Sequence, residues 1–345
     1  TTQTTVRGET ASVRVGSDVV KEAVANNSSR IVIKPEISGD VTRTEVAIPA
    51  ATVGQIKRDT SADLTVSAPA ADVTIPHAVL ETLSGDVKVV TEQADQAISV
   101  TLTAGGRTVE SVPGGLTLTI PAENAGPGTV AVLLHEDGTR ETLRRSIAAD
   151  GKVTVPLNGS ATVEIVDNSR EFADVPSGNW AADAVAFASA HELFSGTSDT
   201  TFSPDQVMSR GMLASVLYRL EGSPEQDGAA TFGDVGSDAW YADGVAWATE
   251  NGIANGYGNG QFGPDDSITR EQFVVMLWKY AGSPQAGSQT LGFTDAAQVS
   301  GYAKEALCWA VECGILSGYD GQLAPGGTAT RAQAAQMLKN FMENT

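Results

Sequence analysis

The chain has 345 residues, a hydrophobic content of 41% and a formal net charge of −20. This length predicts two or more domains, and the strong acidity argues against nucleic acid or an anionic membrane surface as a partner. No apolar run is long enough to span a bilayer, so no transmembrane segment is predicted. The chain starts at Thr1 without a signal-peptide pattern, and we expect any leader to have been removed or left out.

Residues 1–166 are predicted to be rich in short strands. Residues 1–8 are polar and are expected to be frayed. Helices are predicted over residues 18–24, 49–58 and 76–83, the last two with Pro in the first turn. Strands rich in Val, Ile and Thr are predicted over residues 11–15, 30–35, 45–48, 64–66, 72–75, 87–91, 97–103, 116–120, 130–135, 143–148, 152–156 and 161–166.

Turn dipeptides such as Asp137-Gly138 separate the later strands, as in a β-sandwich or small barrel. We therefore predict one α+β unit or two small β-rich units over residues 1–166, and a linker over 166–171. His77 and His135 have no second ligand at metal spacing, so no metal site is predicted. The region contains no recognisable catalytic motif, and we expect neither enzymatic activity nor a cofactor.

The second part of the chain repeats one pattern three times. Phe172, Phe232 and Phe293 open the three copies, at steps of 60 and 61 residues. A fixed period of this kind predicts stacked copies of one supersecondary unit. The three repeats are predicted over residues 172–222, 232–282 and 293–342.

Each repeat predicts a helix, a Gly-rich loop and a second helix. Gly252 and Gly314 suit a left-handed stop after the first helix. The second helix begins after a hydroxyl residue, and in repeats 2 and 3 a Gln three positions later completes a capping box. Neither helix hides its apolar stripe alone, so the three copies are expected to pack around a common axis. The side chains Phe187, Trp247 and Trp309 are predicted to be core residues, and His191 a surface residue.

The pattern Phe-x-Asp-Val, aromatic, Gly-Ile-x-x-Gly, Phe/Leu-x-Pro and Ile-Thr-Arg-Glu/Ala resembles that of S-layer homology repeats. The resemblance covers residues 172–342 and implies an all-α pseudo-trimer whose grooves bind a secondary cell-wall polysaccharide. That polymer is linked to peptidoglycan and is typically capped by a pyruvylated, hence anionic, amino sugar. The strand-rich first half also resembles modules found upstream of such repeats in surface proteins of Gram-positive anaerobes. The implied role is non-covalent anchoring of a secreted protein at the cell wall, in an S-layer setting.

Three equivalent arginines, Arg210, Arg270 and Arg331, are the leading candidates for glycan contact. Residues 172–345 contain only seven Lys and Arg, and these three lie in the first turn of a helix, where free amides and the helix dipole favour an anion. Arginine also offers a bidentate fork to a carboxylate. In the alternative interpretation, each arginine pairs with an aspartate and locks one repeat onto the next. The aspartates in question are Asp174, Asp234 and Asp295.

Further candidates line the same predicted grooves. Trp180, Trp240 and Tyr302 precede the first helix of each repeat, and the sequence leaves open whether the two tryptophans face a groove or the core. The other predicted glycan-binding residues are Thr269, Thr330, Asp174, Asp234 and Asp295. Repeat 2 matches the pattern fully, whereas repeats 1 and 3 depart from it. We expect one or two competent grooves, with Arg270 in the best of them.

Three functions are compatible with this organisation. The first is anchoring by the repeats, with residues 1–166 as a structural, display or adhesion module. The second is an S-layer lattice subunit that self-associates through residues 1–166, which exposed strand edges would permit. The third is a hydrolase of a wall or host polymer in residues 1–166, for which no motif speaks.

Overall fold

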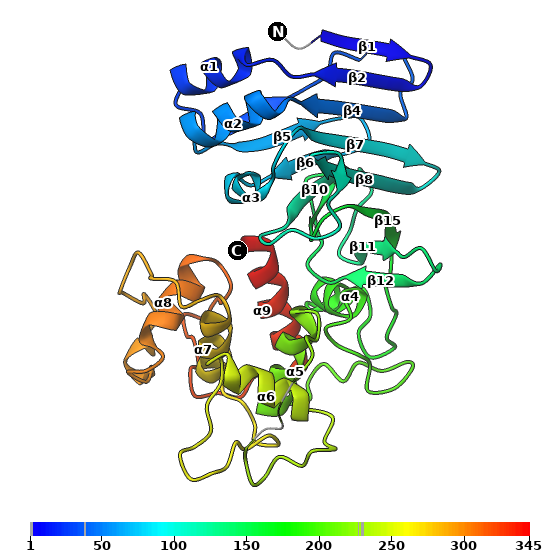
Figure 1. Ribbon diagram of the computed structural model, residues 1–345. Helices are drawn as coiled ribbons and strands as arrows, with labels where there is room; N and C mark the ends of the chain where they lie inside the picture. The colour runs from blue at the N-terminus through cyan, green and yellow to red at the C-terminus, as the bar shows by residue number, and fades with distance from the viewer. Residues whose placement is uncertain (1–2, 38, 227, 229–230) are drawn as a thin grey trace. The chain divides into compact units, whose positions relative to one another are not determined.

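The computed structural model describes residues 3–37, 39–226, 228 and 231–345, and it divides into two compact units, Thr1–Asp167 (unit 1) and Asn168–Thr345 (unit 2) (Figure 1). Unit 1 is rich in β-structure and unit 2 is helical. Among the described residues, no helix is both long and apolar enough to cross a membrane.

Two β-sheets make up most of unit 1. Pairing is antiparallel except between β2 and β4 and between β3 and β5. In order of pairing, the first sheet consists of β1 (Gln3–Arg7), β2 (Thr10–Arg14), β4 (Arg43–Ile48), β7 (Val87–Ala94), β8 (Ala97–Ala104), β15 (Ala161–Asp167), β11 (Thr129–Leu134) and β12 (Arg140–Leu143), with β9 (Arg107–Thr108) beside β8. The second sheet consists of β13 (Ile147–Ala149), β14 (Lys152–Leu157), β10 (Leu116–Pro121), β6 (Asp72–Ile75), β5 (Asp63–Ser67) and β3 (Arg30–Ile33).

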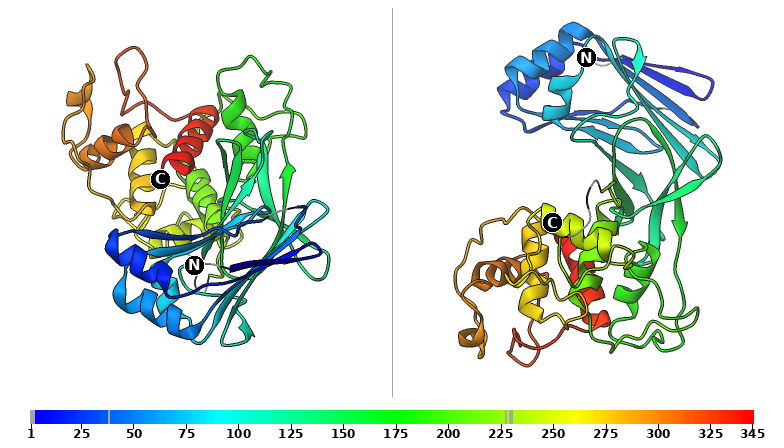
Figure 2. Two further views of the ribbon diagram at one scale, coloured as in Figure 1. Left: turned by 90° about the horizontal axis from the view of Figure 1, so that it is seen from above. Right: turned by 60° about the horizontal axis from the view of Figure 1, so that its bottom comes forward.

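Three helices connect the two sheets of unit 1. They are α1 (Asp18–Ala25), α2 (Ala50–Asp59) and α3 (His77–Thr82), and they lie side by side at the same end of the strands (Figures 1 and 2). Alternate residues of the strands point inward and meet apolar residues of the helices in one continuous core. Fully buried members such as Ile48, Leu64 and Leu102 each contribute about 1.5–3 kcal/mol by leaving water. Residues of both sheets therefore share a single core.

Two predictions for unit 1 are wrong. Residues 3–7 are not frayed, because they form β1, which pairs with β2; Thr1 and Thr2 lie outside the described residues. The single strand predicted over 143–148 is also not formed, because Leu143 ends β12 and residues 147 and 148 belong to β13. There the chain turns, with the Ser146 amide donating to the Leu143 carbonyl, and passes from β12 in one sheet to β13 in the other. An apolar sequence pattern alone could not reveal that change of sheet.

In unit 2, each repeat supplies two helices. Repeat 1 has α4 (Ala182–Ala190) and α5 (Arg210–Leu220), repeat 2 has α6 (Ala242–Glu250) and α7 (Arg270–Tyr280), and repeat 3 has α8 (Lys304–Glu312) and α9 (Arg331–Asn344), preceded by the short 3-10 helix η1 (Ala296–Gln298). Helix α5 packs against α6, α7 against α8, and α9 against α4 (Figure 1). The second helix of each repeat thus packs on the first helix of the next, and repeat 3 closes back onto repeat 1.

A cycle of backbone hydrogen bonds joins the three repeats at their centre. The Met208 amide donates to the Ala329 carbonyl, the Ala329 amide to the Ile268 carbonyl, and the Ile268 amide to the Met208 carbonyl, at 2.8, 3.0 and 2.9 Å. All three residues are fully buried. Buried backbone groups must be paired, so this cycle binds each repeat to both of the others.

The ends of the repeat helices follow local sequence rules, with one exception. Gly252 and Gly314 have φ of +68°, as predicted for helix stops. The capping boxes of repeats 2 and 3 are present, and in repeat 1 Met212 takes the place of the glutamine. The prediction for His191 is wrong: it is 0% exposed, its Nδ1 lies 2.8 Å from the Phe187 carbonyl, and its ring stacks on Phe187. Phe187 itself is a core residue, as predicted, and so are Trp247 and Trp309.

Candidate functional site: grooves between the repeats

The three equivalent arginines each reach from their own repeat into the next. Each begins a second helix, and each donates from Nε to a backbone carbonyl of the loop in the following repeat. The contacts are Arg210 to Phe262 at 3.0 Å, Arg270 to Leu323 at 2.8 Å and Arg331 to Phe202 at 2.8 Å. The arginines are therefore part of the contacts that hold the repeats together.

The three equivalent aspartates of the repeats bind the same loops through backbone amides. Asp295, for example, accepts the amides of Leu323 and Ala324 at 2.9 and 2.7 Å. The Leu323 amide lowers the pKa of Asp295, against the effect of burial, and the charge of Arg270 lowers it further. Asp174 and Asp234 make the equivalent pairs of hydrogen bonds in repeats 1 and 2. Arginine and aspartate thus fix one loop together, the arginine through a carbonyl and the aspartate through amides.

The amides at the start of the second helices are already used. In α7, the Arg270 amide donates to the Gly327 carbonyl, the Glu271 amide to Pro325, and the Gln272 amide to the Thr269 hydroxyl. The same three bonds recur at the start of α5 and α9, where Ser209 and Thr330 are the caps. The expectation of free amides at these helix starts is therefore wrong, because the neighbouring repeat supplies acceptors for the first two amides and the cap hydroxyl accepts from the third. An anion must rely on side chains here.

Beyond Nε, the arginines are not equivalent. Arg210 donates a second hydrogen bond to the Asn255 carbonyl, and Arg331 one to the Ser195 carbonyl, at 2.8 and 2.7 Å. Both are 7% exposed. In the part of the chain that the structure describes, Arg270 donates from Nε only, and it is partly exposed. Its two terminal nitrogens are left for another partner.

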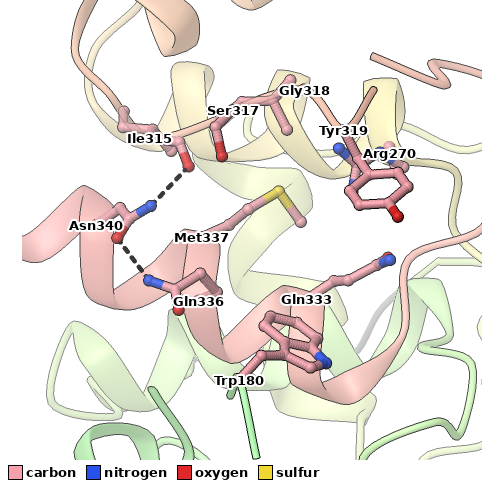
Figure 3. A pocket seen from close by; sticks show the side chains of 11 residues that line it. Trp180, Arg270, Ile315, Ser317, Gly318, Tyr319, Gln333, Gln336, Met337 and Asn340 are labelled. Carbon is pink, nitrogen blue, oxygen red and sulfur yellow. Dashed lines mark hydrogen bonds between the residues drawn. The ribbon is translucent and has the colours of Figure 1, made fainter. Parts of the chain in front are cut away.

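Arg270 lines a cavity of about 600 Å³ to which all three repeats contribute (Figure 3). Trp180 comes from repeat 1, Arg270 from repeat 2, and the loop 315–319 and helix α9 from repeat 3. We call this cavity the Arg270 groove. Its lining residues are Trp180, Arg270, Ile315, Leu316, Ser317, Gly318, Tyr319, Gln333, Gln336, Met337 and Asn340.

The chemistry of the Arg270 groove suits an anion that also carries polar groups. Gln333, Gln336 and Asn340 follow one face of α9, at the spacing of helix neighbours (Figure 3). Burial lowers the pKa of Arg270 while Asp295 raises it, and an arginine remains charged in such a setting. No carboxylate is among the lining side chains. The groove therefore presents one cation, a row of amides and, at its mouth, Trp180 and Tyr319, which are 65% and 89% exposed.

Of the predicted site residues, the structure brings Trp180 and Arg270 together in this cavity. Trp240 and Tyr302 lie exposed at the equivalent places of the other repeats. The remaining predicted residues take part in contacts within or between repeats: Arg210, Arg331, Asp174, Asp234, Asp295, Thr269 and Thr330. Their role in glycan binding stays a prediction.

Sequence reasoning missed part of the groove. Tyr319, Gln336 and Asn340 were not singled out, although Gln333, Gln336 and Asn340 recur at the spacing of neighbours on one helix face. Among the described residues, no cluster of three or more His, Cys, Asp and Glu side chains could hold a metal ion.

Residues 171–211, 231–274 and 292–335 each match the S-layer homology domain. An amylopullulanase of Thermoanaerobacterium thermosulfurigenes is 26% identical over 253 residues, which are 69% of this chain and 14% of the relative. A surface-layer 125 kDa protein of Lysinibacillus sphaericus is 30% identical over 170 residues (48% and 14%). An S-layer protein of Bacillus licheniformis is 25% identical over 190 residues (54% and 22%). The matches thus span less than a quarter of each of these relatives.

Proposed function

We propose that this secreted, cell-surface protein with three tandem S-layer homology domains is anchored at the cell wall by those domains. In this proposal an anionic secondary cell-wall polysaccharide binds in the Arg270 groove. The ligand would be a pyruvylated polymer linked to peptidoglycan. Its carboxylate would meet the terminal nitrogens of Arg270. Its hydroxyl or amide groups would meet the side-chain amides on α9 that are left after Gln336 Nε2 donates to Asn340 Oδ1 and Asn340 Nδ2 to the Ile315 carbonyl.

One observation carries this proposal. Arg270 lines a cavity and its terminal nitrogens bond to none of the described residues, whereas Arg210 and Arg331 each donate a terminal nitrogen to a backbone carbonyl. Exposed aromatic side chains at the mouth support a saccharide, because sugar rings pack on aromatic faces through their apolar C–H groups. A carboxylate that forms two charge-assisted hydrogen bonds to one arginine gains both affinity and orientation.

For unit 1 we propose a structural or display role without catalysis. Residues 1–167 contain no Phe, Trp or Tyr, so this unit has no aromatic platform for a sugar ring. On the outer face of its first sheet, ion pairs join Arg43 to Glu45 and Glu92, and Lys88 to Glu45. These charged side chains are therefore already paired with one another. These features favour a spacer or a surface for other proteins over a second wall-binding site.

The test is sedimentation of the full chain with purified cell-wall sacculi. Arg270→Ala should weaken binding by about 1.5–3 kcal/mol, roughly ten- to 150-fold, because charged hydrogen bonds of that worth are lost. Lys304→Ala is the matched control, since it removes one exposed cation of the same unit away from the groove. Acid extraction of the polysaccharide should abolish pelleting of the wild type.

Two results would contradict the proposal. If the folded Arg270→Ala chain pellets as well as the Lys304→Ala chain, Arg270 does not hold the ligand. If the wild type still pellets with extracted peptidoglycan, the receptor is another wall component. Strong residual binding by Arg270→Ala would direct attention to unit 1 or to another groove.

A further inference from the structure

We propose that Leu323 selects the binding groove: it leaves Arg270 available to ligand, whereas the phenylalanines at the same position, Phe202 and Phe262, commit Arg331 and Arg210 to the fold. Each of the three stands two residues before the loop proline of its repeat. The inference rests on the function proposed above and deepens it, because it names what makes the three grooves unequal.

The phenylalanine rings hold the guanidinium groups in place. Arg331 lies over Phe202, 4.5 Å from the ring centroid, and Arg210 lies over Phe262 at 4.7 Å. A second ring lies near each, Phe194 at 5.2 Å from Arg331 and Tyr257 at 4.9 Å from Arg210. Contacts of this kind shift an equilibrium by roughly two- to thirtyfold. Nε and one terminal nitrogen of each of these two arginines also donate to backbone carbonyls. Each guanidinium group is therefore held by two hydrogen bonds and by ring contacts.

Leu323 offers Arg270 a different surface. It is buried like its two counterparts, but an aliphatic side chain has no π face to attract a cation. The loop carbonyl is still bonded to Nε of Arg270, so the arginine keeps its reach between repeats. Arg270 lines the cavity, and among the described residues no hydrogen bond joins its terminal nitrogens to the Ser317 carbonyl, the counterpart of the Asn255 and Ser195 carbonyls (Figure 3).

Repeat 2 carries a second feature that would hinder an anion, the buried side chain of Glu271. The buried carboxylate of Glu271 accepts hydrogen bonds from the Ser300 amide at 3.0 Å, the Ser300 hydroxyl at 2.7 Å and the Tyr302 hydroxyl at 3.0 Å. Burial and the bond to Glu271 raise the pKa of Tyr302 to about 12, while the charge of Arg210 acts in the opposite direction. A fixed carboxylate therefore already lies beside Tyr302, and it disfavours a second anion there. Gly211 and Ala332 occupy the Glu271 position in the other repeats.

The phenylalanine contacts and the Glu271 carboxylate together predict that unit 2 has one competent groove. Phe202→Leu should release Arg331 and create a second site, beside Trp240. Phe262→Leu should not create a site unless Glu271→Ala is added. Leu323→Phe should close the Arg270 groove although Arg270 itself is retained.

The first measurement needs no ligand. The intact chain is treated with an arginine-selective 1,2-dicarbonyl reagent, and the modified positions are located by mass spectrometry. In the wild type, Arg270 should react faster than Arg210 and Arg331. Leu323→Phe should slow Arg270, and Phe202→Leu should accelerate Arg331 alone. Equal rates for the three arginines in the wild type, or rates that none of these variants changes, would overturn the proposal.

The second measurement is calorimetric titration with a saccharide capped by a pyruvylated amino sugar. One site is expected for the wild type, two for Phe202→Leu, and about tenfold weaker binding for Leu323→Phe. Thermal melts establish that the variants are folded. If Phe202→Leu does not fold, the test rests on Leu323→Phe, which introduces the residue found at this position in repeats 1 and 2. The expected reactivity pattern without saccharide binding would refute the proposed function alone. Saccharide binding by Arg270 that Leu323→Phe leaves unchanged would refute the role of Leu323 alone.

Discussion

The two units of this chain build their cores from different residue types. Unit 1 has no aromatic side chain, whereas all 9 Phe, 5 Trp and 6 Tyr of the protein lie from residue 172 onward. Unit 1 is held by long strand pairings around an aliphatic core. Unit 2 has short helices, and its stability depends on contacts that each repeat makes with the other two.

The difference bears on function. A β-unit that completes its own core can be displayed at a surface without a partner, whereas the repeats create their groove only where three of them meet. The same difference in aromatic content allows the unfolding of the two units to be followed by different spectroscopic signals. Tryptophan fluorescence reports on unit 2 alone, while far-UV circular dichroism in the strand region is dominated by unit 1.

The largest expected effect comes from breaking the closed three-repeat arrangement. A chain that ends at residue 291 lacks the packing of α9 on α4 and of α8 on α7. It also lacks the two hydrogen bonds that Ala329 contributes to the central cycle. We expect unit 2 to lose its cooperative unfolding transition and native tryptophan emission, and the chain to lose wall binding, while the strand signal of unit 1 persists. A truncated chain that kept native emission and a cooperative melt would show that two repeats suffice.

Much of this fold could be predicted from local sequence. The three repeats, the capping boxes at Thr269 and Thr330, and the helix stops at Gly252 and Gly314 follow from short-range rules that packing does not overrule. Most strands of unit 1 follow from alternation. The short strand β9 and the change of sheet after β12 could not be predicted, because they depend on which strand lies alongside.

The candidate site was less accessible to sequence reasoning. The triad of arginines stood out by its period, yet the period concealed that each one reaches into the next repeat. Helix amides that are free in an isolated repeat are bonded in the assembled unit. The asymmetry between Arg270 and its counterparts depends on Leu323, a residue more than 50 positions away that sequence reasoning treated as core filling.

An intermediate effect is expected from the arginines themselves. Arg331→Ala leaves the Phe202 and Ser195 carbonyls without their donor, and should lower the free energy of unfolding of unit 2 by about 2–4 kcal/mol. Arg270→Ala removes the donor of one carbonyl at a partly exposed position and should cost about 1–2 kcal/mol. Urea unfolding followed by tryptophan fluorescence measures both. Equal losses would mean that the two arginines serve the fold alike, contrary to the assignment of Arg270 to ligand.

The smallest effect separates the two units most cleanly. Gly252 in unit 2 and Gly138 in unit 1 both have positive φ, +68° and +82°, and an added Cβ would meet nothing within 4 Å at either. Alanine at each should therefore cost only the backbone strain, about 1–2 kcal/mol. Gly252→Ala should shift the fluorescence-detected transition and Gly138→Ala the one detected by hydrogen exchange in β11 and β12. The two substitutions are chemically identical, so each serves as the control for the other. A Gly138→Ala chain whose tryptophan transition also moves would show that the two units unfold together. The units would then differ in composition but not in stability.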